Sequence, residues 1–321
     1  MNTTAKLAAL LLGLATLNSQ LSTARAQGSL TPPAGVPAPV FKTLSQIEPR
    51  TPISTASFTI SQPGSYYLTT NLTGVGASPG ITIATNDVTL DLSGFAITGP
   101  AVTYAGVYVG SGSYTNVTIR NGTIKGWVEG VRILDVNCKN IVLDQLNIAD
   151  AFGFGIEANG AAITRCTITA SGNDGIFARN SHLENTTVDS SRGAVIALYG
   201  GSLMNSHVQN CAKDGVFINA AGNQVIGNTF QNNNTTNSAT HASIRIQDAN
   251  NRIENNHISG SGAAGAGIWC TASYSGNVII RNTVLGGGGT DYTINGSQFV
   301  GPIITTTGTI TNLNPWANFS N

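Results

Sequence analysis

The residues that could do chemistry recur at a nearly regular spacing along the chain. One series is ionisable: Asp174, Arg192, Asp214 and His241, with Lys213 directly before Asp214. Carboxylates, amines and imidazoles move protons in enzymes, and arginine can neutralise a substrate carboxylate. A second series mixes aromatic with charged residues: Tyr108, Arg132, Glu157, Phe177, Phe217, Arg245 and Trp269. Flat rings with a polar edge suit the faces of sugars, and arginine suits carboxylates or sulfates.

Both series follow an internal repeat. Apolar residues that open a short alternating segment lie at positions 81, 107, 131, 156, 176, about 195, 216, 244 and 268, a mean spacing of about 23 residues. Each repeat holds three short apolar/polar alternations with Gly and Asn between them, which is strand periodicity. Three short strands in a repeat of this length predict one turn of a parallel β-helix. A leucine-rich repeat would need Leu-x-Leu and a helical half, and neither occurs.

Proline and asparagine support this prediction. All 11 prolines lie at or before Pro100, or at Pro302 and Pro315. Stacked parallel strands use every backbone N–H in the ladder, so proline is excluded from them. Asparagines precede the last strand of many repeats, at Asn121, Asn185, Asn205, Asn228, Asn256 and Asn282. Asparagine tolerates the left-handed conformation of a corner, and we expect these side chains to stack as an amide ladder.

Stacking converts the two series into columns, because equivalent positions of successive turns lie about 4.8 Å apart. The inward positions are Ile81, Val107, Val131, Ile156, Ile176, Val216, Ile244 and Ile268. In the sixth copy either Val195 or Ile196 completes them. The residue after each inward position points outward, and we call this set the outward row: Thr82 followed by the second series above. The ionisable series, together with Glu129, Phe154 and Ala266, forms the turn column that precedes it.

Each column has two interpretations. The outward row is a sugar-binding surface or a surface covered by a loop or a neighbouring chain. In the turn column, two steps place the carboxylates of Asp174 and Asp214 about 9–10 Å apart, close to the roughly 6.5–9.5 Å of inverting glycosidases. A lyase or epimerase would instead use Lys213, Arg192 or His241 against a uronate. The alternative is an ion ladder of alternating charges, as for Arg132 with Glu157.

Composition bounds the class of protein. Charged residues make up 9% of the chain, with 15 Lys+Arg against 15 Asp+Glu, which argues against a nucleic-acid binder. Lys6, an apolar run over residues 7–17 and Ala24-Arg25-Ala26 have the order of a signal peptide. The run is too short to span a membrane. We therefore expect a secreted, periplasmic or cell-surface protein, cleaved near Ala26. Its oligomeric state is left open.

The predicted organisation has five parts. Residues 1–26 are the signal peptide, 27–52 a Pro-rich linker, 53–79 an N-terminal cap hairpin, 80–300 the parallel β-helix of about nine coils, and 301–321 a C-terminal capping tail. The hairpin prediction rests on the Pro63-Gly64 pair between two alternating segments. Cys138, Cys166, Cys211 and Cys270 are expected as buried apolar residues, with two disulfides as the alternative.

No cofactor is expected. His182, His207 and His257 do not converge on one column, so no metal site is predicted. Calcium at the Asp-bearing turns is unsupported, because no dense acidic cluster occurs there.

In its repeat, its proline-free coil and its asparagine corners, the chain resembles the right-handed parallel β-helix proteins of the pectate-lyase-like superfamily. Residues 60–68 (ISQPGSYYL) and 314–319 (NPWANF) carry a closer similarity to exported bacterial β-helix repeat proteins of unassigned activity. The resemblance implies an all-β, single-stranded right-handed β-helix, but one fold hosts many functions. The Asp-Pro-His-Glu signature of alginate epimerases and the motifs of polygalacturonases are absent.

Three functions remain open at this point. The first is non-catalytic binding of an extracellular or cell-wall polysaccharide by the outward row, with acidic polysaccharides among the candidates. The second is a polysaccharide lyase or uronate epimerase that uses the turn column. The third is a structural or adhesive surface protein. The missing enzyme motifs favour the first and the third, and a mere spacer has no need for aromatic residues aligned on one face.

Overall fold

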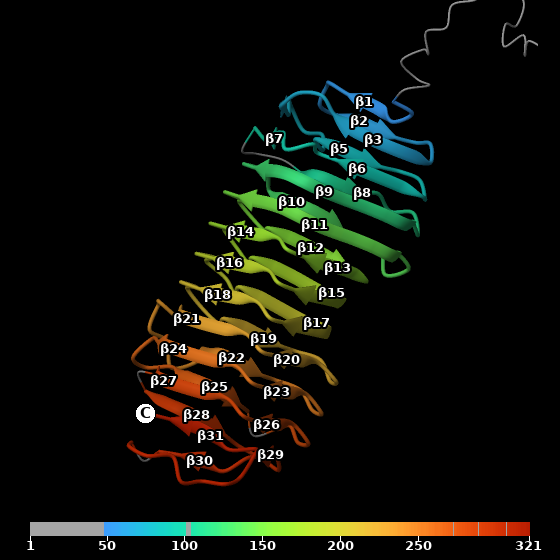
Figure 1. Cartoon of the computed structure of the whole chain (residues 1–321). Coiled ribbons are helices and arrows are strands. Elements are labelled where there is room, and N and C mark those ends of the chain that lie inside the picture. The colour runs from blue at the N-terminus through green and yellow to red at the C-terminus, as the bar shows by residue number, and fades with distance from the viewer. Residues whose placement is uncertain (1–47, 101–103, 272, 288, 306) are drawn as a thin grey trace, which may run out of the picture. The chain divides into compact units, whose positions relative to one another are not determined.

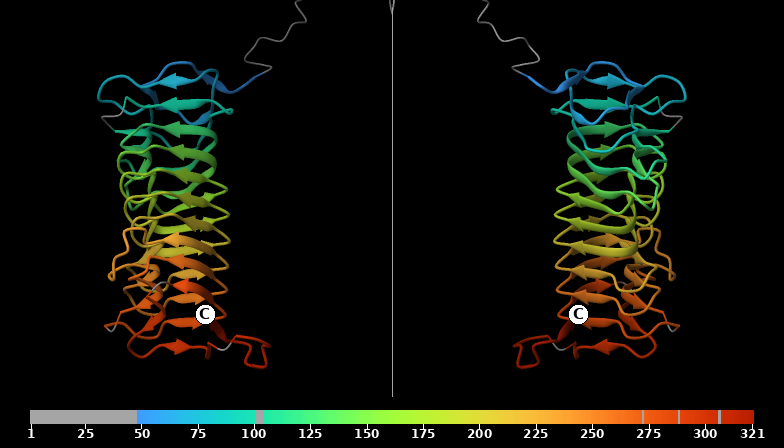
Figure 2. Two further views of the ribbon diagram at one scale, coloured as in Figure 1. Left: turned by 90° about the vertical axis from the view of Figure 1, so that its left-hand side faces the viewer. Right: turned by 90° about the vertical axis from the view of Figure 1, so that its right-hand side faces the viewer.

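The computed structural model describes residues 48–321 except 101–103, 272, 288 and 306. Within these residues all 31 regular elements are strands, and they pair in parallel with the strands of the next turn. Figure 1 shows them as successive rungs from the blue to the red end of the chain, and Figure 2 shows the same rungs from two sides. The predicted signal peptide, and the predicted linker up to residue 47, lie outside the described residues.

The strands form three sheets, one for each side of a turn. The first sheet consists of β2 (Phe58–Ile60), β5 (Ile81–Ile83), β8 (Ala105–Val109), β10 (Glu129–Ile133), β12 (Ile156–Asn159), the first parts of β15 (Ile176–Glu184) and β17 (Ile196–Met204), β19 (Val216–Ile218), β22 (Ala242–Ile246), β25 (Ala266–Cys270) and β28 (Thr290–Ile294). This sheet carries the outward row.

The second sheet follows it in each turn. It consists of β1 (Thr51–Ile53), β3 (Gly64–Leu68), β6 (Val88–Asp91), the first parts of β9 (Thr115–Lys125) and β11 (Lys139–Ala149), β13 (Ala161–Thr164), the second parts of β15 and β17, β20 (Gln224–Ile226), β23 (Arg252–Glu254), β26 (Val278–Ile280) and β29 (Phe299–Val300).

The third sheet closes each turn. It consists of β4 (Leu72–Thr73), β7 (Ala96–Thr98), the second parts of β9 and β11, β14 (Thr167–Thr169), β16 (Thr187–Asp189), β18 (His207–Gln209), β21 (Thr229–Asn233), β24 (His257–Ser261), β27 (Thr283–Gly287), β31 (Asn318–Ser320) and, beside β31, β30 (Ile303–Ile304). The predicted solenoid is therefore confirmed, with about ten turns.

The core lies inside the turns. The inward positions of the first sheet, such as Val131, Ile176 and Ile244, are fully buried, and each meets its equivalents above and below. In the sixth copy Ile196 is the inward residue, because it pairs with Ile176 and Val216. All four cysteines are buried and free, as the prediction of small apolar residues required. Burial raises the pKa of the Cys166 thiol to about 11.

The predicted N-terminal hairpin is wrong. Strands β2 and β3 flank Pro63-Gly64, but they do not pair with each other. Instead β2 pairs with β5 and β3 pairs with β6, both in parallel. The Pro-Gly turn is a corner between the first and second sheets, and the Gly64 N–H donates to the Asp87 carbonyl in the equivalent corner of the next turn. Residues predicted to cap the solenoid thus form its first turn.

The described residues contain no helix long and apolar enough to cross a membrane.

The C-terminal tail extends the solenoid. Strand β31 pairs with β27 and adds a rung to the third sheet. Asn318 brings its side-chain amide into the column of buried asparagines that contains Asn282. The predicted capping by residues 301–321 therefore includes a strand that continues the ladder.

The predicted asparagine column divides into two. Asn228, Asn256 and Asn282 are buried and stack as an amide ladder. Asn121, Asn185 and Asn205 instead occupy a neighbouring corner position with a positive φ of 48–60°. Asparagine serves both positions for different reasons, since its amide pairs with itself in one and its short side chain permits the left-handed backbone in the other.

Candidate functional site

The outward row has the register that the sequence predicts. Pairing along the first sheet aligns Thr82, Tyr108, Arg132, Glu157, Phe177, Ala197, Phe217, Arg245 and Trp269 in successive turns. Ala197 occupies the row position of the sixth copy, which the sequence left ambiguous. It is 2% exposed and lies between Phe177 and Phe217 of the adjacent turns. The row is thus one continuous column of side chains on the surface of the first sheet.

The C-terminal part of the row is an arginine between two aromatic rings. The guanidinium carbon of Arg245 lies 5.1 Å from the ring centroid of Phe217 and 5.3 Å from that of Trp269. These distances are typical of cation–π contacts. Each of the three residues comes from a different turn, so the strand pairing positions them. The result is a half-buried strip with two flat apolar surfaces and a cation between them.

A second aromatic cluster was missed by the sequence analysis. The guanidinium carbon of Arg179 lies 4.2 Å from the ring centroid of Phe177 and 5.9 Å from that of Tyr199. The Phe177 ring also contacts Phe154 and Tyr199, at centroid distances of 5.3 Å and 5.0 Å. Arg179 and Tyr199 lie two positions after the outward row in their strands, so strand alternation places them on the same face. That alternation was the signal that could have identified them.

Near its N-terminal part the row is an ion network. Arg132 Nε lies 3.6 Å from Glu157 Oε2, and Arg132 Nη1 lies 3.8 Å from Glu129 Oε2. Arg179 Nη1 lies 3.9 Å from Glu157 Oε1. Burial raises the pKa of the Glu129 carboxyl, while Arg132 lowers it and Glu157 raises it. The predicted pairing of Arg132 with Glu157 is confirmed, and within the described residues Arg132 Nε and Glu129 Oε2 are buried without a hydrogen-bond partner.

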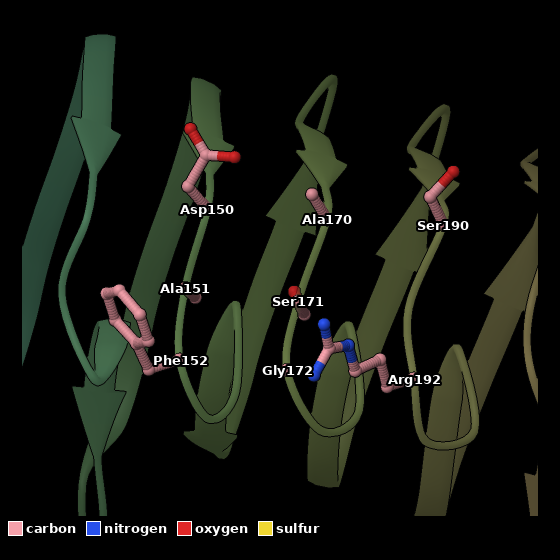
Figure 3. A pocket seen from close by; sticks show the side chains of 8 residues that line it. All are labelled: Asp150, Ala151, Phe152, Ala170, Ser171, Gly172, Ser190 and Arg192. Carbon is pink, nitrogen blue, oxygen red and sulfur yellow. The ribbon is translucent and has the colours of Figure 1, made fainter. Parts of the chain in front are cut away.

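The turn column is wrong for Arg192. The Gly175 N–H donates to the Ala194 carbonyl of the next turn, and the Val195 N–H donates to the Asp214 carbonyl of the turn after that. The same bond therefore recurs from turn to turn, and Ala194 is the residue equivalent to Asp174 and Asp214. Arg192 lies two residues earlier and lines a separate hollow (Figure 3). The physical reason is that register is fixed by the inward residue Ile196, and counting back from it places Ala194, not Arg192, in the column.

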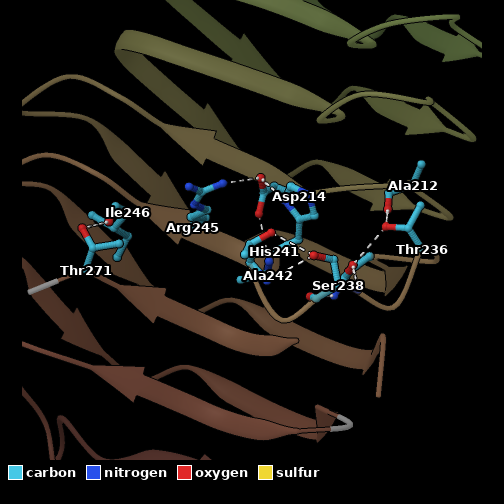
Figure 4. A network of polar contacts seen from close by, with 11 residues as sticks. Ala212, Asp214, Thr236, Ser238, His241, Ala242, Arg245, Ile246 and Thr271 are labelled. Atoms are coloured by element: carbon cyan, nitrogen blue, oxygen red, sulfur yellow. Dashed lines mark hydrogen bonds and ion pairs between the residues drawn. The ribbon is translucent and has the colours of Figure 1, made fainter. Parts of the chain in front are cut away.

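Asp214 is the centre of a hydrogen-bond network (Figure 4). Its side chain is 4% exposed, and its Oδ1 accepts a hydrogen bond of 2.8 Å from the Ala242 backbone N–H. Its Oδ2 lies 3.0 Å from His241 Nδ1 and 3.4 Å from Arg245 Nη1. Because the Gly215 N–H donates to the Ala242 carbonyl, Ala242 is the residue equivalent to Asp214. His241 lies one residue before this column, and its side chain contacts Asp214 in the preceding turn. The network fixes the guanidinium of Arg245 between its two rings.

Asp174 differs from Asp214 because few groups compensate its burial. Burial is the main reason why the pKa of the Asp174 carboxyl is raised to about 6. A backbone hydrogen bond at Ala194 and the charge of Lys213 lower this pKa, whereas the charge of Asp214 raises it. A Cβ at Gly193 would overlap Asp174 Oδ1, so glycine leaves the space that this carboxylate occupies. No hydrogen bond or ion pair within the described residues engages the Lys213 ammonium group.

Of the five residues predicted for catalysis, four gather beside the outward row: Asp174, Lys213, Asp214 and His241. Chemically, Asp174 can gain or lose a proton near neutral pH, Lys213 offers a cation, and Asp214 with His241 holds Arg245. Within the part of the chain that the structure describes, no three His, Cys, Asp or Glu side chains gather as a metal site would require.

Comparison with known proteins identifies the architecture. A family model described as "Right handed beta helix region" matches residues 200–312. The fold is a right-handed parallel β-helix. The resemblance to pectate-lyase-like β-helix proteins is thereby confirmed at the level of the fold. A search of curated protein sequences found no match.

Solved structures share the fold at low identity. A mannuronic acid specific polysaccharide family 6 lyase from human gut microbiota is 13% identical, covers 84% of this chain and 73% of its own, and has a TM-score of 0.54. An alginate lyase from Paenibacillus sp. is 15% identical over 78% of this chain and 97% of its own, with a TM-score of 0.49. The A-module of a mannuronan C-5 epimerase from Azotobacter vinelandii is 13% identical over 85% and 89%, with a TM-score of 0.48.

Proposed function

We propose that this protein binds an acidic extracellular polysaccharide along the outward row. The observation that carries the proposal is the strip Phe217–Arg245–Trp269, in which two aromatic rings from different turns flank one arginine. Aromatic rings stack on the apolar faces of sugar rings, and the arginine lies where a sugar carboxylate between them would need a cation. The Phe177, Arg179 and Tyr199 cluster supplies the same combination further along the face.

The fixed geometry of Arg245 supports binding rather than simple charge neutralisation. Asp214 is almost fully buried and holds Arg245 through one guanidinium nitrogen at 3.4 Å. The side chain of Arg245 remains 19% exposed. An arginine whose position is fixed before binding loses less conformational entropy when it meets a carboxylate. Export as a secreted, periplasmic or cell-surface protein, after cleavage near Ala26, belongs to the same proposal, because polysaccharides of this kind are extracellular.

The test is a retention assay on immobilised polysaccharides. Alginate and polygalacturonate serve as acidic polymers, and dextran serves as a neutral one. We expect retention on one or both acidic polymers, and a loss of retention in Trp269→Ala. Trp316→Ala is the matched control, because Trp316 is 46% exposed at the C-terminal end, away from the row. Equal behaviour of the two variants, or no retention of the parent on any polymer, contradicts the proposal and favours a structural or adhesive role.

A second function, a uronate lyase or epimerase, is favoured by one observation. The Asp174 carboxyl, with its pKa raised to about 6, lies in the electrostatic range of Lys213 and beside the row. Ionised Asp174 would remove the proton from the carbon next to a uronate carboxylate, while Lys213 would balance the charge that develops there. The electron pair would then form a double bond and expel the neighbouring glycosidic oxygen, which takes a proton from water, or water would donate a proton to the carbon from the opposite face.

Product analysis separates the two functions. A lyase releases unsaturated sugars that absorb ultraviolet light, whereas an epimerase changes the ratio of uronates in the intact polymer. We expect either product to disappear in Asp174→Asn and to decrease in Lys213→Ala. Retention with neither product leaves binding as the function, and product that persists in Asp174→Asn removes this residue from the mechanism.

A further inference from the structure

A hollow of about 400 Å³ opens beside the outward row, on the corner that leads from the third sheet into the first. It spans three successive turns, and its lining consists of Asp150, Ala151, Phe152, Ala170, Ser171, Gly172, Ser190 and Arg192. Figure 3 shows these residues as two short columns, with Asp150, Ala170 and Ser190 in one and Phe152, Gly172 and Arg192 in the other. The hollow is distinct from the outward row and from the Asp174 and Asp214 carboxylates.

The hollow exists because the middle turn has small residues where its neighbours have large ones. Gly172 lies between Phe152 and Arg192, and a Cβ at this glycine would overlap the Phe152 carbonyl oxygen. A larger residue therefore cannot occupy this position without moving the backbone of the preceding turn. The other residues of the middle turn that line the hollow are also small, namely Ala170, which lies between Asp150 and Ser190 (Figure 3), and Ser171. The floor is thus low, and the aromatic ring and the guanidinium form opposite walls.

The walls carry groups that have no partner within the described residues. From Arg120 onward, the other arginines each form an ion pair with a carboxylate, namely Arg120, Arg132, Arg165, Arg179, Arg245, Arg252 and Arg281. No such pair, and no side-chain hydrogen bond, engages Arg192 or Asp150 in the described part of the chain. Phe152 is 56% exposed. A cation, an anion and an apolar ring therefore face one open space.

We propose that this hollow binds a single acidic sugar residue. The ring of the sugar would stack on Phe152, its carboxylate would accept hydrogen bonds from Arg192, and its hydroxyl groups would donate to Asp150. A phosphate group fits less well, because Asp150 would repel a dianion more strongly than a carboxylate. The proposal rests on the proposed function, since the sugar would be a side branch or a neighbouring residue of the polymer bound along the outward row.

The test uses the full chain and two free sugars, glucuronate and glucose, which differ by one carboxylate. Backbone amide shifts are followed by NMR during titration. We expect glucuronate to shift the amides of residues 150–152, 170–172 and 190–192, and glucose to bind more weakly. Arg192→Gln should weaken glucuronate binding about tenfold or more, because it removes a charged hydrogen-bond donor. Phe152→Ala should weaken both sugars, and Trp316→Ala, which changes an exposed side chain outside both sites, should leave the titration of these amides within about twofold of the parent.

The outcomes separate this proposal from the proposed function. The absence of glucuronate shifts at residues 150–152, 170–172 and 190–192, or an equal affinity in Arg192→Gln, overturns the hollow as a sugar site even if the parent is retained on acidic polymers. If the parent is not retained on any acidic polymer while glucuronate binds at the hollow, the outward row is overturned instead. Arg192→Gln and Phe152→Ala change exposed side chains, and the thermal unfolding of both variants is measured to confirm that they fold.

Discussion

Two columns of this solenoid are built by the same stacking but differ in chemistry. On the inside, the corner before each third-sheet strand carries Asn228, Asn256, Asn282 and Asn318 in successive turns. On the outside, the outward row changes its residue type at nearly every turn. A buried position meets only its own copies, so it must be satisfied by them. A position that faces solvent has no such requirement, so its residue type can change from turn to turn.

The inner column shows how complete this self-satisfaction is. Asn256 Nδ2 donates to Asn282 Oδ1 at 2.9 Å and to the Val225 carbonyl at 2.9 Å. Asn256 Oδ1 accepts from both the backbone and the side chain of Asn228, at 3.0 Å each. All donors and acceptors of one amide are thus paired inside the protein. In the outward row the charged residues form ion pairs, and aromatic rings contact arginines but remain partly exposed.

The largest expected effect breaks the stacking on which both columns depend. Val131→Pro removes a backbone N–H that donates to the Gly155 carbonyl at 3.1 Å and places a ring against the neighbouring turn. We expect a loss of about 3 kcal/mol or more in the free energy of unfolding, measured by urea denaturation. An unchanged midpoint would show that this segment is not a stacked strand.

A smaller effect is expected inside the amide ladder. Asn256→Ala leaves the Val225 carbonyl and the Asn228 backbone N–H without partners, and each such group costs about 1–3 kcal/mol when buried. Asn255→Gly is the matched control, because this exposed neighbour has a φ of 55° that glycine adopts freely. Equal unfolding free energies for the two variants would contradict the ladder as a stabilising element.

In the outward row a substitution should change the binding affinity more than the free energy of unfolding. Trp269→Ala should weaken binding to an acidic polysaccharide by about 1–3 kcal/mol, because it removes one stacking surface next to Arg245. Its free energy of unfolding should change little, since truncating a partly exposed side chain leaves no closed cavity. Calorimetry measures both quantities. A large drop in melting temperature with unchanged affinity would identify Trp269 as a packing residue.

The smallest effect concerns Asp174 and pH. Because its folded-state pKa is raised from 3.8 to about 6, the folded protein holds this proton more tightly than the unfolded chain. Its contribution to stability is complete below about pH 4 and is lost as the pH rises through 6. We expect the loss between pH 4 and pH 7 to be about 1–2 kcal/mol, since partial exposure reduces the full effect. Asp174→Asn should remove this part of the pH profile, and an unaltered profile would assign it to other groups.

The sequence predicted the fold because the repeat is local and periodic. Spacing, strand alternation and the absence of proline between residues 101 and 301 each follow from stacked parallel strands. The hairpin at Pro63-Gly64 was wrong because a tight turn looks the same whether its flanking strands pair with each other or with the next turn. That choice depends on contacts with β5 and β6, which are distant in sequence.

The site was predictable only where the register was unambiguous. The outward row follows from its inward neighbours, and the structure places each of its predicted members in register. Arg192 was misplaced because the register of the sixth copy was ambiguous in the sequence, and only the strand pairing identifies Ile196 as its inward residue. The pairing of Arg179 with two aromatic rings also depends on side-chain directions across turns, and one repeat read alone does not contain that information.

The constant 20-residue step between Ile156, Ile176 and Ile196 makes this part of the chain modular. A tandem duplication of one such unit would insert a rung without altering the contacts inside its neighbours, since each rung touches only the adjacent ones. The surface would lengthen by a fixed increment of about 4.8 Å. Evolution, or an engineer, could thus lengthen the outward row one turn at a time.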